Sequence, residues 1–169
     1  MNRIFVGIDN GVTGAVAALA EDGRVVYLGP LPVVKIGSET VLDERLFRAQ
    51  LAALRKDYAD STMHVLVEPA QTFTPGSKAL RSTWACWGAI RTVLNLEGYA
   101  WEPVNPQKWQ RAMFSDHVRA VDQTAKNASI VVSQRLFPAT KLLRTEKSRT
   151  PDSGLADALL IAEYGRRKR

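Results

Sequence analysis

Short apolar runs, separated by turn residues, predict five strands. The segments are 3–9, 15–20, 24–28, 64–68 and 99–103. The second and third segments are separated by Glu21-Asp22-Gly23, which is typical of a tight turn. The first three segments follow one another through short turns, and this favours an antiparallel three-strand meander. The other two alternate with helical segments, so the pattern predicts a mixed five-stranded sheet.

Apolar positions three or four residues apart predict helices between and after these strands. In the segment that Asp43 opens, Leu46, Phe47, Leu51 and Leu54 share one face. Helices are expected at residues 43–58, 78–96, 106–113, 122–136 and 152–165. The prolines and glycine of residues 30–38 predict a loop. The fold class is therefore α/β, with a five-stranded sheet flanked by helices in a single domain over residues 1–169.

Composition and charge narrow the class of protein. One cysteine, Cys86, excludes an intramolecular disulfide, and no apolar run approaches the ~20 residues of a membrane span. We therefore expect a soluble, intracellular protein without a membrane partner. The net charge of +6 is uneven, because residues 103–169 hold 13 Lys and Arg against 6 Asp and Glu, whereas residues 1–102 hold 10 against 11. A basic last two-fifths of the chain favours nucleic-acid binding, with a solvated basic face as the alternative.

Acidic residues stand where the surrounding sequence is most apolar. Asp9 ends the first strand, Glu68 ends the fourth, and Asp157 lies within the apolar run LADALLIA. A buried carboxylate is costly without a partner, although a single one is more often a helix or turn cap. A shared cation would compensate all three. Carboxylate oxygens are the ligands that Mg²⁺ prefers, so the pattern predicts a magnesium site.

Asp152 is a less certain member of this set on spacing alone. It opens the last helix at the end of a basic loop, which is typical of an N-cap. It precedes Asp157 by five positions, so the two side chains differ by about 140° around an ideal helix. Both reach one site only if Asp152 lies in the loop or in a distorted first turn. Clustered acids that hold two divalent ions are the machinery of phosphodiester cleavage.

An ordered set of motifs covers nearly the whole chain. It comprises Gly7-Ile8-Asp9 with Gly14-Ala15, Val67-Glu68, the Trp-rich segment 84–90, Pro106-x-x-Trp109, Lys126-x-x-Ser129, Leu136-Phe137-Pro138 and the segment from Asp152 to Gly165 (DSGLADALLIAEYG). Together these motifs resemble the RuvC-type Holliday-junction resolvases, and the phage and chloroplast branch most of all. Two features depart from that family: Ser153 stands where the branch often has His or an acid, and the bacterial enzymes place the two late acids three apart.

The resemblance implies a ribonuclease H-like fold and a homodimer that makes paired symmetric nicks in a four-way DNA junction. It implies that four acids are catalytic and hold Mg²⁺, for which Mn²⁺ can substitute: Asp9, Glu68, Asp152 and Asp157. It also implies that Lys126 faces DNA phosphate near this site.

Residues beside these motifs are further candidates for contact with DNA. Phe73 lies in a Thr/Pro/Gly loop just after Glu68 and is a candidate to wedge into or stack on a base at the opened junction, with core packing as the alternative. Trp109 is expected to anchor the Pro106 turn in the core, and Lys108 flanks it. The loop before Asp152 carries four cations: Lys141, Arg144, Lys147 and Arg149. Phosphate contact is the functional interpretation of these cations and solvated charge the alternative. Trp84 and Trp87 favour core packing, with a dimer seam as the alternative.

Three other functions compete with junction resolution. The first is a ribonuclease H-like nuclease that acts on RNA–DNA hybrids, flaps or other branched DNA. The second is a kinase- or actin-like nucleotide-binding domain, because residues 9–14 (DNGVTG) resemble a phosphate loop. That fold needs a second phosphate-binding half for which this chain is too short, so no nucleotide cofactor is expected. The third is a non-catalytic DNA-binding module, against which the four ordered acids argue.

Overall fold

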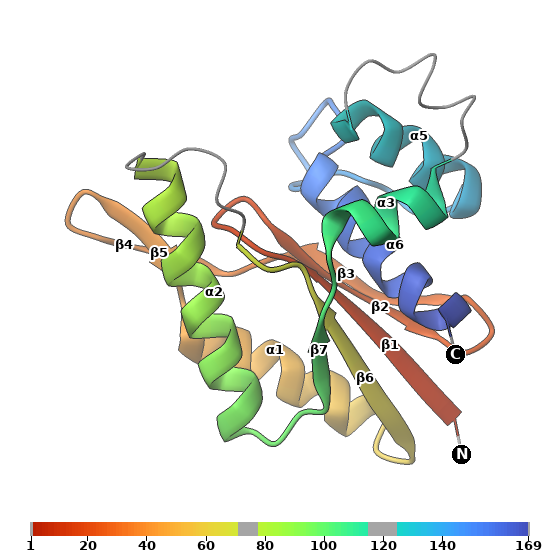
Figure 1. The fold of residues 1–169 in the computed structure, drawn as a ribbon, viewed down its shortest axis with the longest axis horizontal. Coiled ribbons are helices and arrows are strands. Elements are labelled where there is room, and N and C mark those ends of the chain that lie inside the picture. Colours follow the sequence, from red (N-terminus) through yellow and green to blue (C-terminus); the bar gives the residue numbers. More distant parts are fainter. Residues whose placement is uncertain (1, 71–77, 115–124, 169) are drawn as a thin grey trace.

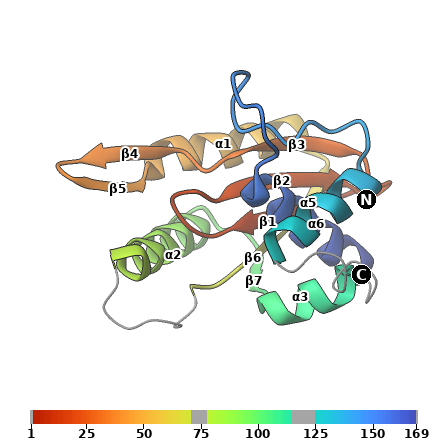
Figure 2. The same cartoon turned by 90° about the horizontal axis from the view of Figure 1, so that it is seen from above.

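A computed structural model describes residues 2–70, 78–114 and 125–168, and it shows one mixed sheet with helices on both faces (Figures 1 and 2). The five strands are β1 (Asn2–Asp9), β2 (Ala15–Ala20), β3 (Val25–Pro30), β6 (Ser61–Val67) and β7 (Trp101–Pro103). Their order across the sheet is β3-β2-β1-β6-β7. β1, β2 and β3 pair antiparallel, whereas β6 pairs parallel with both β1 and β7. The predicted meander with two further strands is confirmed.

The helices also lie where the apolar periodicity predicts them. They are α1 (Glu44–Asp57), α2 (Lys78–Leu96), α3 (Pro106–Met113), α5 (Ala125–Leu136) and α6 (Ser153–Lys168). The start of the fourth predicted helix, at residue 122, lies outside the described residues. α1 begins after Asp43 because that side chain accepts a hydrogen bond from the backbone N–H of Leu46 at 2.9 Å. Across the described ranges, no helix is both long enough and apolar enough to cross a membrane.

The prediction of a loop at residues 30–38 is wrong. Most of this segment belongs to a two-stranded hairpin, in which β4 (Val33–Ile36) pairs with β5 (Glu39–Leu42). The prolines stand before β4 rather than within it, and Gly37, with a φ of 60°, sits in the turn. The hairpin extends beyond the main sheet, and β5 contacts α2 (Figures 1 and 2).

Alternation along the strands separates two cores on opposite faces of the sheet. Ile4, Val6 and Ile8 of β1 are buried with apolar side chains of α1 and α2. The intervening β1 positions face the other side, which α3, α5 and α6 cover (Figure 1). Each fully buried aliphatic side chain contributes about 1.5–3 kcal/mol. Packing in these two cores fixes the position of α6 relative to the ends of the strands.

α6 lies directly against the backbone of β1. A Cβ added to Gly7 would stand 2.2 Å from the carbonyl oxygen of Ala158 and 2.4 Å from the nitrogen of Ala162. Real Cβ atoms do not approach backbone this closely, so the contact requires glycine on the strand and small residues on the helix. Gly154, Ala158, Ala162 and Gly165 supply a stripe of small residues along α6, all buried.

Gly7→Ala is therefore expected to lower the free energy of unfolding by at least ~3 kcal/mol, because α6 would have to move away from the sheet. The matched control is Gly88→Ala, at an exposed α2 position with no atom within 4 Å of the added Cβ. That substitution should stabilise the protein by about 0.5–1 kcal/mol. Urea unfolding measures both, and equal effects of the two substitutions would contradict the close packing of α6.

Candidate active site

Two of the predicted acids lie side by side at the ends of neighbouring parallel strands. Ile8 of β1 pairs with Val67 of β6, and the N–H of Glu68 donates to the carbonyl of Ile8 at 3.0 Å. Side chains alternate along each strand, so Asp9 and Glu68 both point to the face that α6 covers. The register of β1 and β6 thus places the two carboxylates next to each other.

The N-terminus of α6 lies over Asp9. A Cβ at Gly154 would stand 3.1 Å from Asp9 Oδ2 and 2.7 Å from the carbonyl oxygen of Thr13. Asp157 lies one turn further along α6, and its charge raises the pKa of Asp9. The packing of α6 on β1 therefore adds a third carboxylate to the two at the strand ends.

Crowding and burial disfavour the ionised form of Asp9. Its pKa is raised well above the usual 3.8, first by burial and then by the charges of Asp157, Glu68 and Asp152, while Arg144 acts in the opposite direction. All four predicted acids thus lie close enough to interact through their charges. That these four carboxylates act together as ligands stays a prediction.

Asp157 faces α5, where two residues partly offset its burial. Burial raises its pKa from 3.8 to about 7, and the charge of Glu68 adds to that rise. A hydrogen bond from Ser129 and the charge of Lys126 lower it. Ser129 is almost fully buried, whereas Lys126 is exposed, so the Lys-x-x-Ser segment supplies a neutral donor inside and a cation outside.

Glu68 is held by the indole of Trp109. Trp109 Nε1 donates to Glu68 Oε2 at 2.8 Å, and the ring has no exposed surface. Trp109 lies on α3, which Asn105 caps by accepting a hydrogen bond from the N–H of Gln107. The sequence motif predicted that Trp109 anchors this turn in the core; the structure adds that its polar atom orients a site carboxylate.

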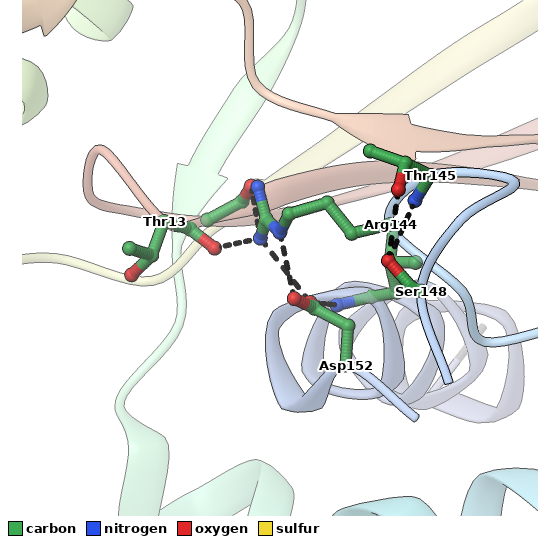
Figure 3. A network of polar contacts seen from close by, with 7 residues as sticks. Thr13, Arg144, Thr145, Ser148 and Asp152 are labelled. Atoms are coloured by element: carbon green, nitrogen blue, oxygen red, sulfur yellow. Dashed lines mark hydrogen bonds and ion pairs between the residues drawn. The ribbon is translucent and has the colours of Figure 1, made fainter. Parts of the chain in front are cut away.

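The carboxylate of Asp152 is held by Arg144 and by backbone N–H groups at the start of α6. Asp152 is the residue before α6, and its Oδ1 accepts from the N–H of Leu155 at 3.0 Å, as an N-cap does. Arg144 Nε donates to its Oδ2 at 2.6 Å, and Arg144 Nη2 reaches its Oδ1 at 3.2 Å (Figure 3). Burial pushes the pKa of Asp152 up, but the hydrogen bonds and charge of Arg144 bring it below 3.8.

The basic residues predicted to contact DNA fall into two groups. Five are exposed, on α3, on α5 and on the loop that leads into α6: Lys108, Lys126, Lys141, Lys147 and Arg149. Arg144 instead turns inward, and its Nη2 also donates to the carbonyl oxygens of Thr13 and Gly14 (Figure 3). Phe73 lies outside the described residues. Their contact with DNA stays a prediction.

The tryptophan pair of α2 divides between the two interpretations. Trp87 is buried and meets Trp101 edge to face, with ring centroids 5.8 Å apart, so core packing is confirmed for it. Trp84 keeps 44% of its surface exposed. Core packing is therefore wrong for Trp84, because its helical position faces away from the sheet.

The donor set has the chemistry of a site for hard divalent cations. All four acids supply oxygen, and burial together with the charges of neighbouring acids raises the pKa values of Asp9 and Asp157. Across the described residues, no three ligating side chains stand in a coordinating arrangement as they are placed. The residues fit a cation by donor type and charge, and their final geometry requires side-chain adjustment around it.

Sequence reasoning missed the neutral donors and the internal cation of the site. Ser129 was noticed only as part of a motif, and Trp109 only as an apolar anchor. The local sequence does not reveal that either residue donates a hydrogen bond to a carboxylate. The sequence around a buried indole or hydroxyl is the same whether its partner is a carboxylate or a carbonyl. The sequence also does not indicate that Arg144 points inward, because nothing in the loop distinguishes it from the other three cations.

Comparisons with known proteins bear on the fold. The sequence matches no family model and no curated protein. The structure is similar to Thermus thermophilus RuvC in complex with a Holliday junction substrate, with a TM-score of 0.59 and 17% identity over 98% of this chain and 96% of that one. It is also similar to another Thermus thermophilus RuvC structure, with a TM-score of 0.51 and 20% identity over 99% and 96%. The chain has the RuvC fold. This RuvC fold is ribonuclease H-like, as the sequence motifs predict.

The titration of Asp157 has a consequence for stability in the absence of divalent ions. Its folded pKa of about 7 exceeds its unfolded value, so its contribution to stability is fully present below pH 3.8 and is lost as the pH rises through about 7. Asp157→Asn should therefore stabilise the metal-free protein at about pH 8 and much less at about pH 5. Asp152, whose pKa is lowered, is the control of opposite sign: Asp152→Asn should destabilise at about pH 8. Urea unfolding in a chelator tests both, and a pH-independent effect of Asp157→Asn would contradict the shift.

The indole hydrogen bond on Glu68 is expected to appear as energetic coupling. A buried hydrogen bond to a charged group contributes about 1.5–3 kcal/mol, and Trp109→Phe removes that donor together with part of the ring volume. In a double-mutant cycle with Glu68→Gln, the coupling energy should be at least about 1 kcal/mol. Trp101→Phe with Glu68→Gln is the matched control, because Trp101 Nε1 donates to Asn95 instead. Additive effects of Trp109→Phe and Glu68→Gln would contradict the positioning of Glu68.

Proposed function

We propose that this chain is a divalent-cation-dependent DNA endonuclease of the RuvC family that cleaves four-way junctions. The observation that carries the proposal is the convergence of Asp9, Glu68 and Asp157 from three separate elements into one under-compensated acidic site. The similarity to a RuvC structure solved with a Holliday junction, over nearly the full length of both chains, supports the substrate class.

The acids have distinct positions from which to hold a cation. Asp9 and Glu68 approach from the strand ends, with Glu68 oriented by the indole of Trp109. Asp157 approaches from α6 and is oriented by Ser129. Asp152 is the fourth ligand once its bond with Arg144 is exchanged. Bound Mg²⁺, or Mn²⁺ in its place, would supply the charge that activates water and stabilises the leaving oxygen of a phosphodiester.

Exposed cations on the same side of the sheet suit a DNA backbone. Lys126 lies within charge range of Asp157, which places it beside the acidic site. The other exposed cations of this group belong to elements that cover the α6 face: Lys108, Lys141, Lys147 and Arg149. Lys and Arg neutralise phosphates and release counterions, so binding should weaken as salt rises. The proposed DNA path therefore crosses α3, α5 and the loop before α6.

Symmetric cleavage of a four-way junction needs two active sites, so the proposed active form is a homodimer. The exposed face of α2 supports a subunit contact there, because Trp84 is 44% exposed and stands beside the small residues Ala85 and Gly88. Aromatic residues are enriched at protein interfaces, and small neighbours permit close approach of helices.

Asp9→Asn is expected to abolish Mg²⁺-dependent cleavage of a four-way junction while leaving binding to the junction near wild type, because the carboxylate holds the cation rather than the phosphates. Asp57→Asn, at the exposed end of α1, removes the same charge far from the acids and is the matched control. Cleavage of end-labelled four-way junctions, flaps, RNA–DNA hybrids and plain duplex, with electrophoretic binding assays in parallel, measures both properties.

The pattern of products separates the candidate functions. Paired nicks at symmetric positions, confined to the four-way junction, support the proposal. Preferred cleavage of flaps or hybrids would instead make the chain another ribonuclease H-like nuclease. Binding without cleavage of any substrate would indicate a non-catalytic module. Undiminished cleavage by Asp9→Asn would overturn the assignment of the acidic site.

A further inference from the structure

We propose that Arg144 is an internal counter-ion of the acidic site, which competes with a divalent cation for Asp152. The inference rests on the proposed function, since it concerns how the same acids take up their cation. Arg144 thereby has a role at the acidic site that precedes any contact with DNA.

The guanidinium of Arg144 lies where a cation between two of the acids would lie. It binds both carboxylate oxygens of Asp152, at 2.6 and 3.2 Å, and the carbonyl oxygens of Thr13 and Gly14 (Figure 3). Arg144 Nη2 and Asp9 Oδ2 stand 3.2 and 3.1 Å from the same point, the position of a Cβ on Gly154. The carboxylate of Asp152 and two carbonyl oxygens thus contact one positive charge, and Asp9 lies within range of that charge.

The loop holds Arg144 in this place by its backbone. Leu142 is buried, and its carbonyl accepts from the N–H of Asp152 at 2.7 Å. Beyond Arg144, a turn closes between Thr145 and Ser148, whose hydroxyl groups lie 3.0 Å apart (Figure 3). The chain between Leu142 and Asp152 is therefore pinned at both ends, with Arg144 directed inward and Lys147 outward.

This arrangement can exchange for a metal ion. The Arg144 and Asp152 side chains retain 27% and 21% of their surface, so water reaches the pair and screens it. A divalent cation carries twice the charge in a smaller volume and prefers carboxylate oxygen. If Asp152 held such an ion, the guanidinium of Arg144 would be free beside the exposed cations of the loop, where it could bind phosphate in a forked geometry. Until then, Arg144 limits the repulsion among the acids.

Titration of the metal-free protein with Mn²⁺ by isothermal calorimetry tests the competition without reference to catalysis. Arg144→Gln should bind Mn²⁺ about tenfold more tightly than wild type, a change of about 1.4 kcal/mol. Lys147→Gln is the matched control, since it removes the same charge from the same loop at an exposed position. Lys147→Gln should change the Mn²⁺ affinity much less, because solvent screens the charge of this exposed side chain from the acids.

A double substitution shows whether the effect passes through Asp152. In an Asp152→Asn background, Arg144→Gln should no longer tighten Mn²⁺ binding, because the contested carboxylate is gone. Arg144→Lys, which keeps the charge but cannot bind both oxygens in forked geometry, should give an intermediate affinity and serves if Arg144→Gln does not fold. Equal affinities of Arg144→Gln and Lys147→Gln would overturn the proposal, as would a gain that persists in the Asp152→Asn background.

The outcome also separates this proposal from the proposed function. Saturable Mn²⁺ binding by wild type that is lost in Asp9→Asn, with no gain in Arg144→Gln, would overturn the role of Arg144 alone. Absence of Mn²⁺ binding in wild type, Arg144→Gln and Arg144→Lys alike would overturn both proposals.

Discussion

The direct contact between α6 and β1 determines the arrangement of the whole site. The helix backbone approaches the strand at Gly7, where any side chain would meet the carbonyl of Ala158. Only at this distance does the N-terminus of α6 lie over Asp9, and only there can Asp157 join the carboxylates of the two strand ends. The apolar cores on the two faces of the sheet keep the helix and strands in this relation, so the packing of small residues is a precondition for the chemistry.

The close approach of four acids has an energetic cost, which the surrounding residues reduce in different ways. Glu68 accepts a hydrogen bond from a buried indole, Asp157 accepts one from a buried hydroxyl, and Asp152 has a guanidinium and a helix N–H. The pKa of Asp9 nevertheless stays well above its usual value, so these partners do not neutralise the site. Replacing Asp9 or Asp157 with a neutral residue would therefore favour the metal-free fold, since uncompensated buried charge is unfavourable.

The same geometry separates the acids from the cations that would meet DNA. Lys126, Lys141, Lys147 and Arg149 are exposed, whereas Arg144 lies among the acids although it belongs to the same stretch of sequence. Charge along the chain is thus a poor guide to the function of an individual cation. The direction of a loop side chain depends on where the loop is anchored, and here the anchors are Leu142 and Asp152. The site consequently combines buried and half-buried carboxylates with exposed cations on the elements around them.

The sequence by itself determined the five strands of the main sheet, its helices and the antiparallel meander of the first three strands. Apolar alternation and periodicity locate the strands and helices of the sheet, and Asp9, Glu68 and Asp157 stand out because their neighbours are so apolar. The β4–β5 hairpin escaped prediction because its strands are short and largely exposed, so they lack a buried pattern. The partners of the acids were decided only by the tertiary structure. Helix and loop packing brings Trp109 to Glu68, Ser129 to Asp157 and Arg144 to Asp152. These partners are separated along the chain, so the local sequence around one residue does not reveal the other.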